Sequence, residues 1–324
     1  MDVLSEVLQV VKLEGAVFFH GEFSAPWCFR SPQSSEVAPY LSPKAGHLIT
    51  YHLLTEGRAQ ARLSDGQRHD LTAGDVVVFP HGDVHFMGNG LPERPVNSWE
   101  AFGKNITDGL HVCRFGGGGE ITRFVCGFMA CDPRLSEFLL AGLPPILVVN
   151  IANNNSGQWL EQSIRFSVAE VGRASAGSGV VLAKLSEVLF VEILRRYIQS
   201  LPPGETGWLA GSRDSVIGQA LALLHKDASH PWTIASLARQ VGLSRTRLAE
   251  RFRHFLGEPP MTYLTRWRLK LGAEMLDSTE RSVAEIAAEV GYGSEAAFNR
   301  AFKREFACPP AQFRRSAFAR RAIA

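Results

Sequence analysis

Two segments near the C-terminus carry side chains that can recognise nucleic acid, at the spacing of one helical face. In the first segment they are Arg245, Thr246, Arg247, Glu250, Arg251 and Arg253, and in the second Glu295, Asn299, Arg300, Lys303 and Arg304. An arginine can contact a guanine edge through two hydrogen bonds, an asparagine suits adenine, and a glutamate can accept from cytosine. Lysine and arginine also neutralise backbone phosphates. These residue types therefore indicate binding to DNA.

An internal repeat places both segments in the same structural context. Ala235, Ala238, Val241 and Gly242 recur as Ala284, Ala287, Val290 and Gly291, and Ser244, Phe252, Pro259 and Pro260 recur as Ser294, Phe302, Pro309 and Pro310. Each copy predicts a helix, a tight turn and a second helix, because hydroxyl residues such as Thr233 and Ser282 can cap a helix start and glycine can end one. Two ordinary helical hairpins are the alternative, but the matched glycine, serine, phenylalanine and proline positions favour two helix-turn-helix units.

The charge distribution agrees with a polyanionic partner for this part of the chain. From Arg213 onward there are 18 Lys and Arg against 11 Asp and Glu, whereas the rest of the 324-residue chain has 16 against 21. A solvated basic face is the alternative explanation for such an excess.

Cysteine usage and hydropathy predict the compartment. The five cysteines are an odd number without the spacing of a disulfide framework, which fits a reducing environment. No apolar run is long enough to span a bilayer, and acids stand where a signal peptide needs a basic stretch. We therefore expect a cytoplasmic protein without a membrane partner.

Changes of pattern along the chain predict an α+β protein of two domains joined by helices. Residues 1–135 contain short apolar runs between turn signals, at 47–54, 58–63, 75–80, 111–115 and 121–128, which predict a β-barrel or sandwich. Residues 136–205 contain two stretches of helical spacing, 158–172 and 180–201, which predict a helical linker. The second stretch is apolar enough to need a partner surface, either the β domain or a second copy of the chain. After a Pro- and Gly-rich stretch, residues 214–318 predict an all-helical domain.

The segment from Asp214 to Arg315 resembles the AraC/XylS family of bacterial regulators. The stretch 291-GYGSEAAFNRAFKREF-306, with the Pro-Pro that follows it, is the most specific part of this resemblance. The resemblance implies a seven-helix domain in which a long central helix, here about Pro260 to Leu276, holds two helix-turn-helix units against successive major grooves. Ala307 stands where the family usually has glycine, so a local change in that turn is expected.

The resemblance also implies which side chains read bases. The matching positions are Thr246, Ala249 and Glu250 in the first unit and Glu295, Ala296, Ala297 and Arg300 in the second. Together with neighbouring polar side chains, the predicted DNA-binding set is Arg245, Thr246, Arg247, Ala249, Glu250, Arg253, Glu295, Ala296, Ala297, Asn299, Arg300 and Lys303. Several of these are small or acidic, so base reading is expected to depend on few strong hydrogen bonds.

The N-terminal part resembles the cupin-type sensor domains of a subset of these regulators, through 74-GDVVVFPHGDVHFMG-88 and 46-GHLITYHLLTEGRAQARL-63. Metal-dependent cupins typically use two closely spaced histidines, a glutamate and a later histidine. This chain lacks the close pair, because His47 and His52 would face opposite sides of one strand. His52, His81 and His85 could still converge on a metal, or could make ordinary hydrogen bonds, and we predict no metal and no other cofactor.

The signal that the N-terminal part senses stays open at this point. Cys126 lies in an apolar run, where it is either a small buried hydrophobe or a redox-sensing thiol with Cys28 or Cys131 as partner. The aromatic residues Phe18, Phe19, Trp27, Phe29 and Phe79 could line a cavity for a small organic effector, or could fill it. The predicted effector or redox residues are Cys126, Cys28, Cys131, His52 and His85.

These patterns predict a sequence-specific DNA-binding transcription regulator, an activator without enzymatic activity, that responds to a small effector or a redox signal. The expected partners are double-stranded DNA at promoter sites, RNA polymerase and a second copy of the chain, and no catalytic residue is predicted. The alternative is a cupin-type metalloenzyme with an appended helical domain, which would require a complete metal site.

Overall fold

The computed structural model describes residues 2–43, 45–90, 94–107, 111–171 and 176–322. It divides into two compact units. The first, here called the sheet unit, comprises residues 13–131 and 143–197. The second, the helical unit, comprises residues 1–12, 132–142 and 198–324. No helix of the described residues is long and apolar enough to cross a membrane.

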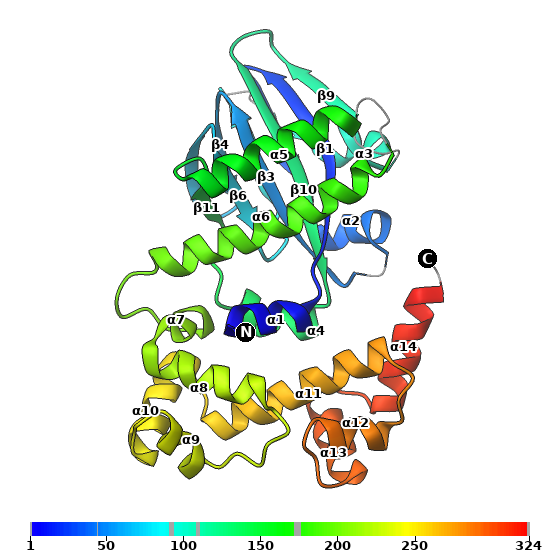
Figure 1. Ribbon diagram of the computed structural model, residues 1–324. Coiled ribbons are helices and arrows are strands. Elements are labelled where there is room, and N and C mark those ends of the chain that lie inside the picture. The colour runs from blue at the N-terminus through cyan, green and yellow to red at the C-terminus, as the bar shows by residue number, and fades with distance from the viewer. Residues whose placement is uncertain (1, 44, 91–93, 108–110, 172–175, 323–324) are drawn as a thin grey trace. The chain divides into compact units, whose positions relative to one another are not determined.

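The sheet unit is built on two sheets (Figure 1). The six-stranded sheet has the order β11-β6-β3-β10-β1-β9, with β1 Glu14–Ser24, β3 His47–Glu56, β6 Asp75–Phe79, β9 His111–Gly116, β10 Ile121–Cys131 and β11 Leu147–Asn150. The five-stranded sheet has the order β5-β4-β7-β2-β8, with β2 Trp27–Ser31, β4 Arg58–Leu63, β5 Arg68–Thr72, β7 His85–Asn89 and β8 Val96–Asn97. Neighbouring strands are antiparallel except for the β1–β9 and β2–β8 pairs. The strands that the sequence predicts at 47–54, 58–63, 75–80, 111–115 and 121–128 are all present.

Aromatic side chains from both sheets fill the interior of the sheet unit. The ring of Phe23 on β1 lies 5.0 Å from that of Trp27 on β2 and 4.9 Å from that of Phe124 on β10, in edge-to-face contacts. Such pairs stabilise beyond the area they bury. Trp27 and Phe79, which the sequence offers as cavity-lining residues, are fully buried in this core. The side chain of Phe18 lies outside the described residues.

Four helices complete the sheet unit, α2 Ser34–Leu41, α3 Ser98–Thr107, α5 Asn155–Val171 and α6 Ser178–Ser200, of which α6 belongs to this unit as far as Tyr197. Helix α6 lies against the six-stranded sheet (Figure 1). Gly15 of β1 permits this approach, because a Cβ there would stand 2.7 Å from the carbonyl oxygen of Ala183. The Tyr51 hydroxyl then hydrogen-bonds to that of Ser186 at 2.6 Å. The predicted apolar helix 180–201 therefore has the β domain as a partner surface.

The helical unit contains both predicted helix-turn-helix units. Its helices are α1 Val3–Val11, α4 Pro133–Leu140, α7 Trp208–Arg213, α8 Ser215–Lys226, α9 Ile234–Gln240, α10 Arg245–Leu256, α11 Pro260–Ser278, α12 Val283–Glu289, α13 Glu295–Phe306 and α14 Pro310–Ala322. The α9–α10 and α12–α13 pairs are the two repeats, and α8 to α14 are the seven helices that the family resemblance implies. The α+β fold class is confirmed.

The local chemistry of each repeat is as the sequence predicts. The hydroxyls of Thr233 and Ser282 accept from the backbone N–H of the third residue of their helices, at 3.1 and 3.2 Å. Ser244 and Ser294 cap the second helices in the same way. Gly242 and Gly291 have φ of +70° and +85°. This is the left-handed region that glycine adopts without the steric cost of a Cβ.

Helix α11 supports both repeats. Near its start, Tyr263 packs its ring 5.6 Å from that of Phe252 of α10. Near its end, Gly272 lets Phe298 of α13 approach, since a Cβ at 272 would lie 2.8 Å from that ring. Phe252 and Phe302, which the repeat places at equivalent positions, are both fully buried. The two second helices are thus fixed on one continuous helix.

Two helices of the helical unit come from the N-terminal half of the sequence. Helix α1 precedes the first strand, and α4 connects β10 to β11. Leu135 of α4 belongs to the same buried cluster as Phe298, Phe302 and Ile286 of the second repeat. The ranges 1–135, 136–205 and 214–318 stay a prediction of domains, but the compact units are discontinuous in sequence. The sequence does not predict this arrangement, because an apolar face on a short helix does not reveal which surface will bury it.

The turn after α13 stores strain at Ala307. This residue has φ of +57°, and Gly257 at the same position of the first repeat has φ of +74°. The expected local change is absent, since the backbone keeps the left-handed turn and alanine adopts it at a cost of about 1 kcal/mol.

We expect Ala307→Gly to raise the free energy of unfolding of the helical unit by about 0.5–1 kcal/mol, and Gly257→Ala to lower it by a similar amount. Urea unfolding of both variants tests this, and a destabilised Ala307→Gly protein would contradict it.

A second prediction concerns α4. Leu135→Ala should destabilise the helical unit by about 2–4 kcal/mol, because it opens a cavity in the core of the second repeat. Hydrogen exchange of the full chain should then accelerate in α12 to α14 and not in β3 or β6. The matched control is Leu160→Ala, which removes a buried leucine of α5 in the sheet unit and should accelerate the strands instead. Equal acceleration of both units by Leu135→Ala would show that α4 is not part of the helical core.

Candidate nucleic-acid interface and the buried histidine–cysteine chain

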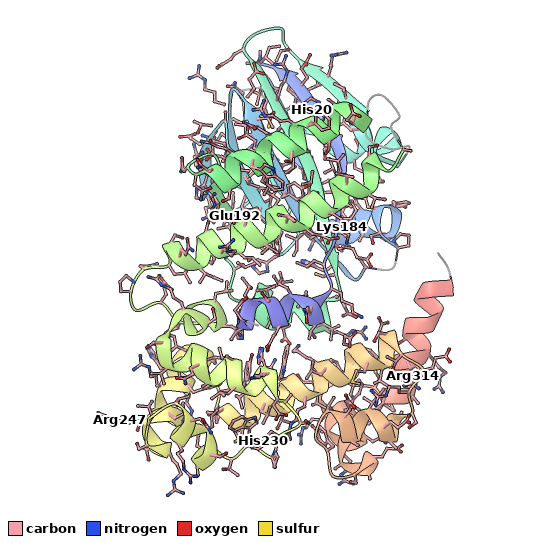
Figure 2. The ribbon with its side chains drawn as sticks, viewed as in Figure 1. His20, Lys184, Glu192, His230, Arg247 and Arg314 are labelled. Atoms are coloured by element: carbon pink, nitrogen blue, oxygen red, sulfur yellow. The ribbon has the colours of Figure 1, made fainter. Side chains whose placement is uncertain are left out.

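Helix α10 presents an exposed polar face over a buried apolar one. The exposed predicted residues are Arg245, Thr246, Arg247, Glu250 and Arg253, and Ala249 is half-buried. Arg247 projects from the surface of α10 (Figure 2). Leu248 and Phe252, on the opposite face, are fully buried and fix the rotation of the helix. The face is therefore held in position by packing while its polar groups stay accessible.

Helix α13 repeats this arrangement with a different set of groups. Glu295, Ala296, Arg300 and Lys303 are exposed, and Ala297 and Asn299 are half-buried. The Asn299 amide donates to the Glu295 carboxylate at 3.3 Å, so these two side chains orient each other. Within the described part of the chain, Arg300 and Lys303 form no ion pair, which leaves both cations available to a polyanion.

Arg251, which the sequence groups with the polar residues of the first segment, and Arg266, which the sequence does not single out, both form ion pairs within the helical unit. The Arg251 guanidinium pairs with Asp214 at 2.6 Å, and Asp214 caps α8. Arg266 on α11 pairs with three carboxylates, those of Glu258, Glu305 and Glu137, each within 3.3 Å. These carboxylates lie just after α10, on α13 and on α4. Arg266 therefore ties both recognition helices to α11 and to α4.

Lys270, one turn after Arg266, is a buried cation. Its ammonium donates to the backbone carbonyl of Arg134 at 2.5 Å and lies 3.7 Å from the Glu137 carboxylate, and both partners are on α4. Burial lowers the pKa of Lys270, and the nearby carboxylate of Glu137 opposes this shift. A buried charge is tolerated only when it is paired and hydrogen-bonded. The spacing of Arg266 and Lys270, one helical turn apart on α11, is the sequence signal that could have indicated a docking site for another segment.

In the sheet unit, three predicted sensor residues meet in a buried chain of hydrogen bonds. His52 Nδ1 lies 2.6 Å from Cys126 Sγ, and His52 Nε2 lies 3.0 Å from His85 Nε2. His85 Nδ1 lies 2.9 Å from the backbone carbonyl of Asp83. A carbonyl only accepts, so His85 donates from Nδ1 and its Nε2 must accept from His52. It follows that His52 Nδ1 accepts and that the Cys126 thiol donates to it.

Burial keeps each member of this chain uncharged. It lowers the pKa of His85 to about 4 and that of His52 well below its ordinary value. Burial also raises the pKa of the Cys126 thiol well above its ordinary value. The proton arrangement of the chain therefore holds at neutral pH, with a thiol and two neutral imidazoles.

A cupin metal does not fit this geometry. His52 uses both ring nitrogens within the chain, and His81 is turned away to hydrogen-bond to the carbonyl oxygen of Leu143. Among the described residues, no three His, Cys, Asp or Glu side chains are grouped so that they could hold a metal ion. Of the two alternatives for these histidines, convergence on a metal is wrong and ordinary hydrogen bonds are observed. His52 and His85 hydrogen-bond to each other, whereas His81 bonds elsewhere.

Comparison with known proteins agrees with both units. Residues 2–199 match the model of the cupin family, and residues 237–316 match that of a helix-turn-helix domain. The chain is 33% identical over 320 residues to a putative AraC-like transcription regulator of Streptomyces antibioticus, covering 97% of this chain and 99% of the relative. The protein belongs to the AraC-like transcription regulators.

This regulator is similar to further proteins. It is 27% identical over 317 residues to the RCS-specific HTH-type transcriptional activator RclR of Escherichia coli, covering 97% of both chains. It also resembles the solved DNA-binding domain of the global transcriptional factor AdpA in complex with a target DNA, with 25% identity and a TM-score of 0.33, over 34% of this chain and all of that one.

The cysteines of the regulator differ in access. None of the five forms a disulfide among the described residues; Cys113, Cys126 and Cys131 are buried, whereas Cys28 and Cys308 are partly exposed. Cys126 is 0% exposed, and its proton is donated to His52. Because the thiolate is the reactive species, the structure favours the packing role of Cys126 over the redox role.

Thiol labelling tests whether Cys126 is a packed, unreactive thiol. With iodoacetamide at pH 7.5, we expect Cys28 and Cys308 of the native protein to be alkylated and Cys126 to stay unmodified until urea unfolds the chain. Peptide mass spectrometry with timed quenching gives the rates. Alkylation of native Cys126 as fast as that of Cys28 would restore it as a candidate redox thiol.

Proposed function

We propose that this regulator binds promoter DNA in a sequence-specific manner by placing α10 and α13 in successive major grooves. The observation that carries this proposal is that both helices expose a polar face while α11 fixes their buried faces. Base contacts would come from Thr246, Ala249 and Glu250 of α10, and from Glu295, Ala296, Ala297 and Arg300 of α13. Arg245, Arg247, Arg253, Asn299 and Lys303 would add contacts to phosphates and flanking bases. The expected target is two half-sites about one helical turn apart.

The regulator acts, in this proposal, as an activator that contacts RNA polymerase. The name of the Escherichia coli relative, an HTH-type transcriptional activator, supports the direction of regulation. The sheet unit would bind the signal, a small effector, and would not catalyse a reaction, since its histidines form a closed chain instead of a metal site. Because its target is the promoter, the protein would work in the cytoplasm.

We also infer a homodimer formed through α5 and α6. Trp159 and Phe166 on α5 are 60% and 68% exposed, and Val181 and Val188 on α6 are about half exposed. Residues seven apart share one helical face, so each pair forms a stripe. Large apolar side chains grouped on a surface indicate an interaction site. A second copy would cover both stripes through a two-fold contact.

The DNA proposal predicts different effects for two residues of α13. Arg300→Ala should weaken binding to the preferred site by about 1–3 kcal/mol and remove the preference at one base position, because a bidentate contact to guanine is lost. Lys303→Ala should weaken binding to all sites alike and reduce the salt dependence by about one counterion.

The preferred site would be selected from genomic fragments, and fluorescence anisotropy on single-base operator variants would compare the two proteins. An Arg300→Ala protein with unchanged base preferences would remove Arg300 from the base-reading set. Salt-sensitive binding of the wild type without any preferred site would contradict the proposed function itself.

The dimer prediction has its own control. Trp159→Asp should convert the dimer to a monomer, because it places a charge in an apolar contact, and sedimentation velocity measures the change. Tyr40→Asp alters a side chain of similar exposure, 65%, on α2 and should leave the dimer intact. A wild-type monomer, or a dimeric Trp159→Asp protein, would refute this interface.

A further inference from the structure

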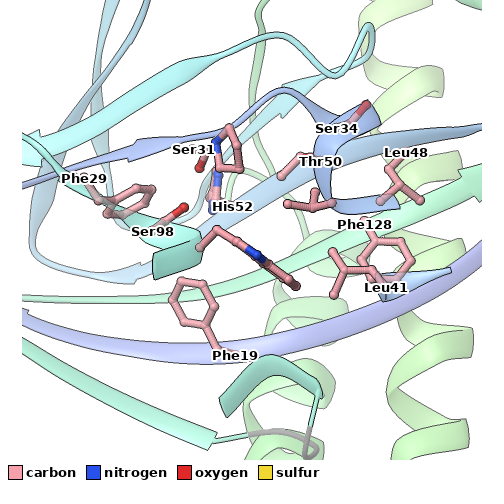
Figure 3. Close-up of a pocket in the computed structure, with 13 residues that line it drawn as sticks. Phe19, Phe29, Ser31, Ser34, Leu41, Leu48, Thr50, His52, Ser98 and Phe128 are labelled. Carbon is pink, nitrogen blue, oxygen red and sulfur yellow. The ribbon is translucent and has the colours of Figure 1, made fainter. Parts of the chain in front are cut away.

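A pocket lies beside His52 in the sheet unit. Its walls come from β1, β2, β3 and β10 and from helices α2 and α3 (Figure 3). Most of the lining is apolar and includes Phe19, Phe29, Phe128 and Leu48. The cavity volume is about 50 Å³, several times the 10–15 Å³ that one water needs. The aromatic core does not fill this part of the unit.

Three serine hydroxyls of this pocket have no protein partner among the described residues. Ser31, Ser34 and Ser98 are 9%, 4% and 8% exposed, and all three line the pocket. None of these hydroxyls hydrogen-bonds to another residue in the part of the chain that the structure describes. Buried polar groups are nearly always hydrogen-bonded, because leaving one unpaired costs free energy. The oxygens of these three serines are open to the pocket, so water or a ligand that enters it can pair with them.

The lining also limits the charge of that occupant. It contains no lysine, arginine, aspartate or glutamate among the described residues. Its single titratable group, His52, is buried and is engaged on both ring nitrogens. A carboxylate or an ammonium would lose its hydration here without gaining a counter-charge, which is far more costly than burying a hydroxyl.

We propose that this pocket binds an uncharged, mainly apolar molecule with one or two hydroxyl or carbonyl groups, and that such a molecule is the effector of the regulator. The inference rests on the proposed function, in which the sheet unit receives a small effector. Serine hydroxyls both donate and accept, so they suit an alcohol, a ketone or a lactone. The apolar part would lie against Phe19, Phe29 and Phe128.

The chain offers a direct connection from the pocket to the helical unit. Phe128, in the wall, lies on β10, as does Cys126, the hydrogen-bond partner of His52. Strand β10 ends at Cys131, and Asp132 is the N-cap of α4. Helix α4 holds Lys270 and Arg266 of α11. An occupant that shifts β10 would therefore act on α4. Through Arg266 and Lys270, it would also act on α11, which fixes both recognition helices.

A matched pair of probes tests the ligand class. Ligand-observed NMR with the full chain would measure binding of 1-hexanol and of hexanoate, which have equal chain lengths and differ in charge. We expect saturable binding of hexanol and at least tenfold weaker binding of hexanoate. Ser31→Ala and Ser98→Ala should each weaken hexanol binding about three- to tenfold, since each removes one hydrogen bond. Ser64→Ala, in the exposed turn after β4, should leave it unchanged.

Operator binding is measured in the same samples, so that the two proposals fail separately. Hexanol should change operator affinity in the wild type, and the change should require a higher hexanol concentration in Ser98→Ala. Intact operator recognition without hexanol binding, or with hexanoate bound equally well, would overturn the pocket assignment and leave the DNA proposal standing. Binding of hexanol without any change in operator affinity would overturn its role as an effector.

Discussion

The position of both recognition helices depends on two cations of α11. Arg266 pairs with carboxylates after α10, on α13 and on α4, and Lys270 is buried against α4 one turn later. A charge in a protein interior is costly, so buried Lys270 constrains the segment that must supply its partners. Those partners include Glu137 and the carbonyl of Arg134, which come from a connection between two strands. The geometry of the DNA-binding surface is therefore set in part by residues more than a hundred positions away.

This dependence gives the regulator a physical route for control. The seven C-terminal helices carry the proposed base-reading residues, but they are completed by α4, whose ends continue into the sheet. Strand β10 and α4 are consecutive in the chain, so under the proposed function a signal that alters β10 would act on α4. Arg134 adds a contact to the last helix, since its guanidinium lies 4.2 Å from the ring of Phe313 on α14. A small displacement of α4 would thus affect the packing of the second repeat.

The interior of the sheet unit shows how one polar chain can be accommodated in an aromatic core. The Cys126–His52–His85 chain ends on a backbone carbonyl, and every donor along it has an acceptor. A network satisfied in this way specifies one arrangement of side chains. Among the described residues, the serine hydroxyls of the neighbouring pocket have no protein partner. The hydrogen-bonded Cys126–His52–His85 chain therefore has a structural role. The pocket beside it, with its unpaired serine hydroxyls, is the part of this interior that suits a ligand.

Local patterns were enough for the elements whose signals lie close together in sequence. The caps Thr233, Ser244, Ser282 and Ser294, the turn glycines and the core phenylalanines act within one or two helical turns, so their types and spacing determined the two repeats. The alternating strands of the N-terminal half were visible for the same reason.

Long-range pairing was decided only by the tertiary structure. Strand register brings His52 beside Cys126 and His85, whereas His81 bonds elsewhere. A single strand does not encode its register with its neighbours. The place of α4 depends on a buried cation of α11 that needed a partner. The sequence determined what each segment is, because local hydrogen bonding and side-chain periodicity act over a few residues. Only the folded chain decided which distant groups complete one another, because burial and charge pairing depend on the whole three-dimensional arrangement.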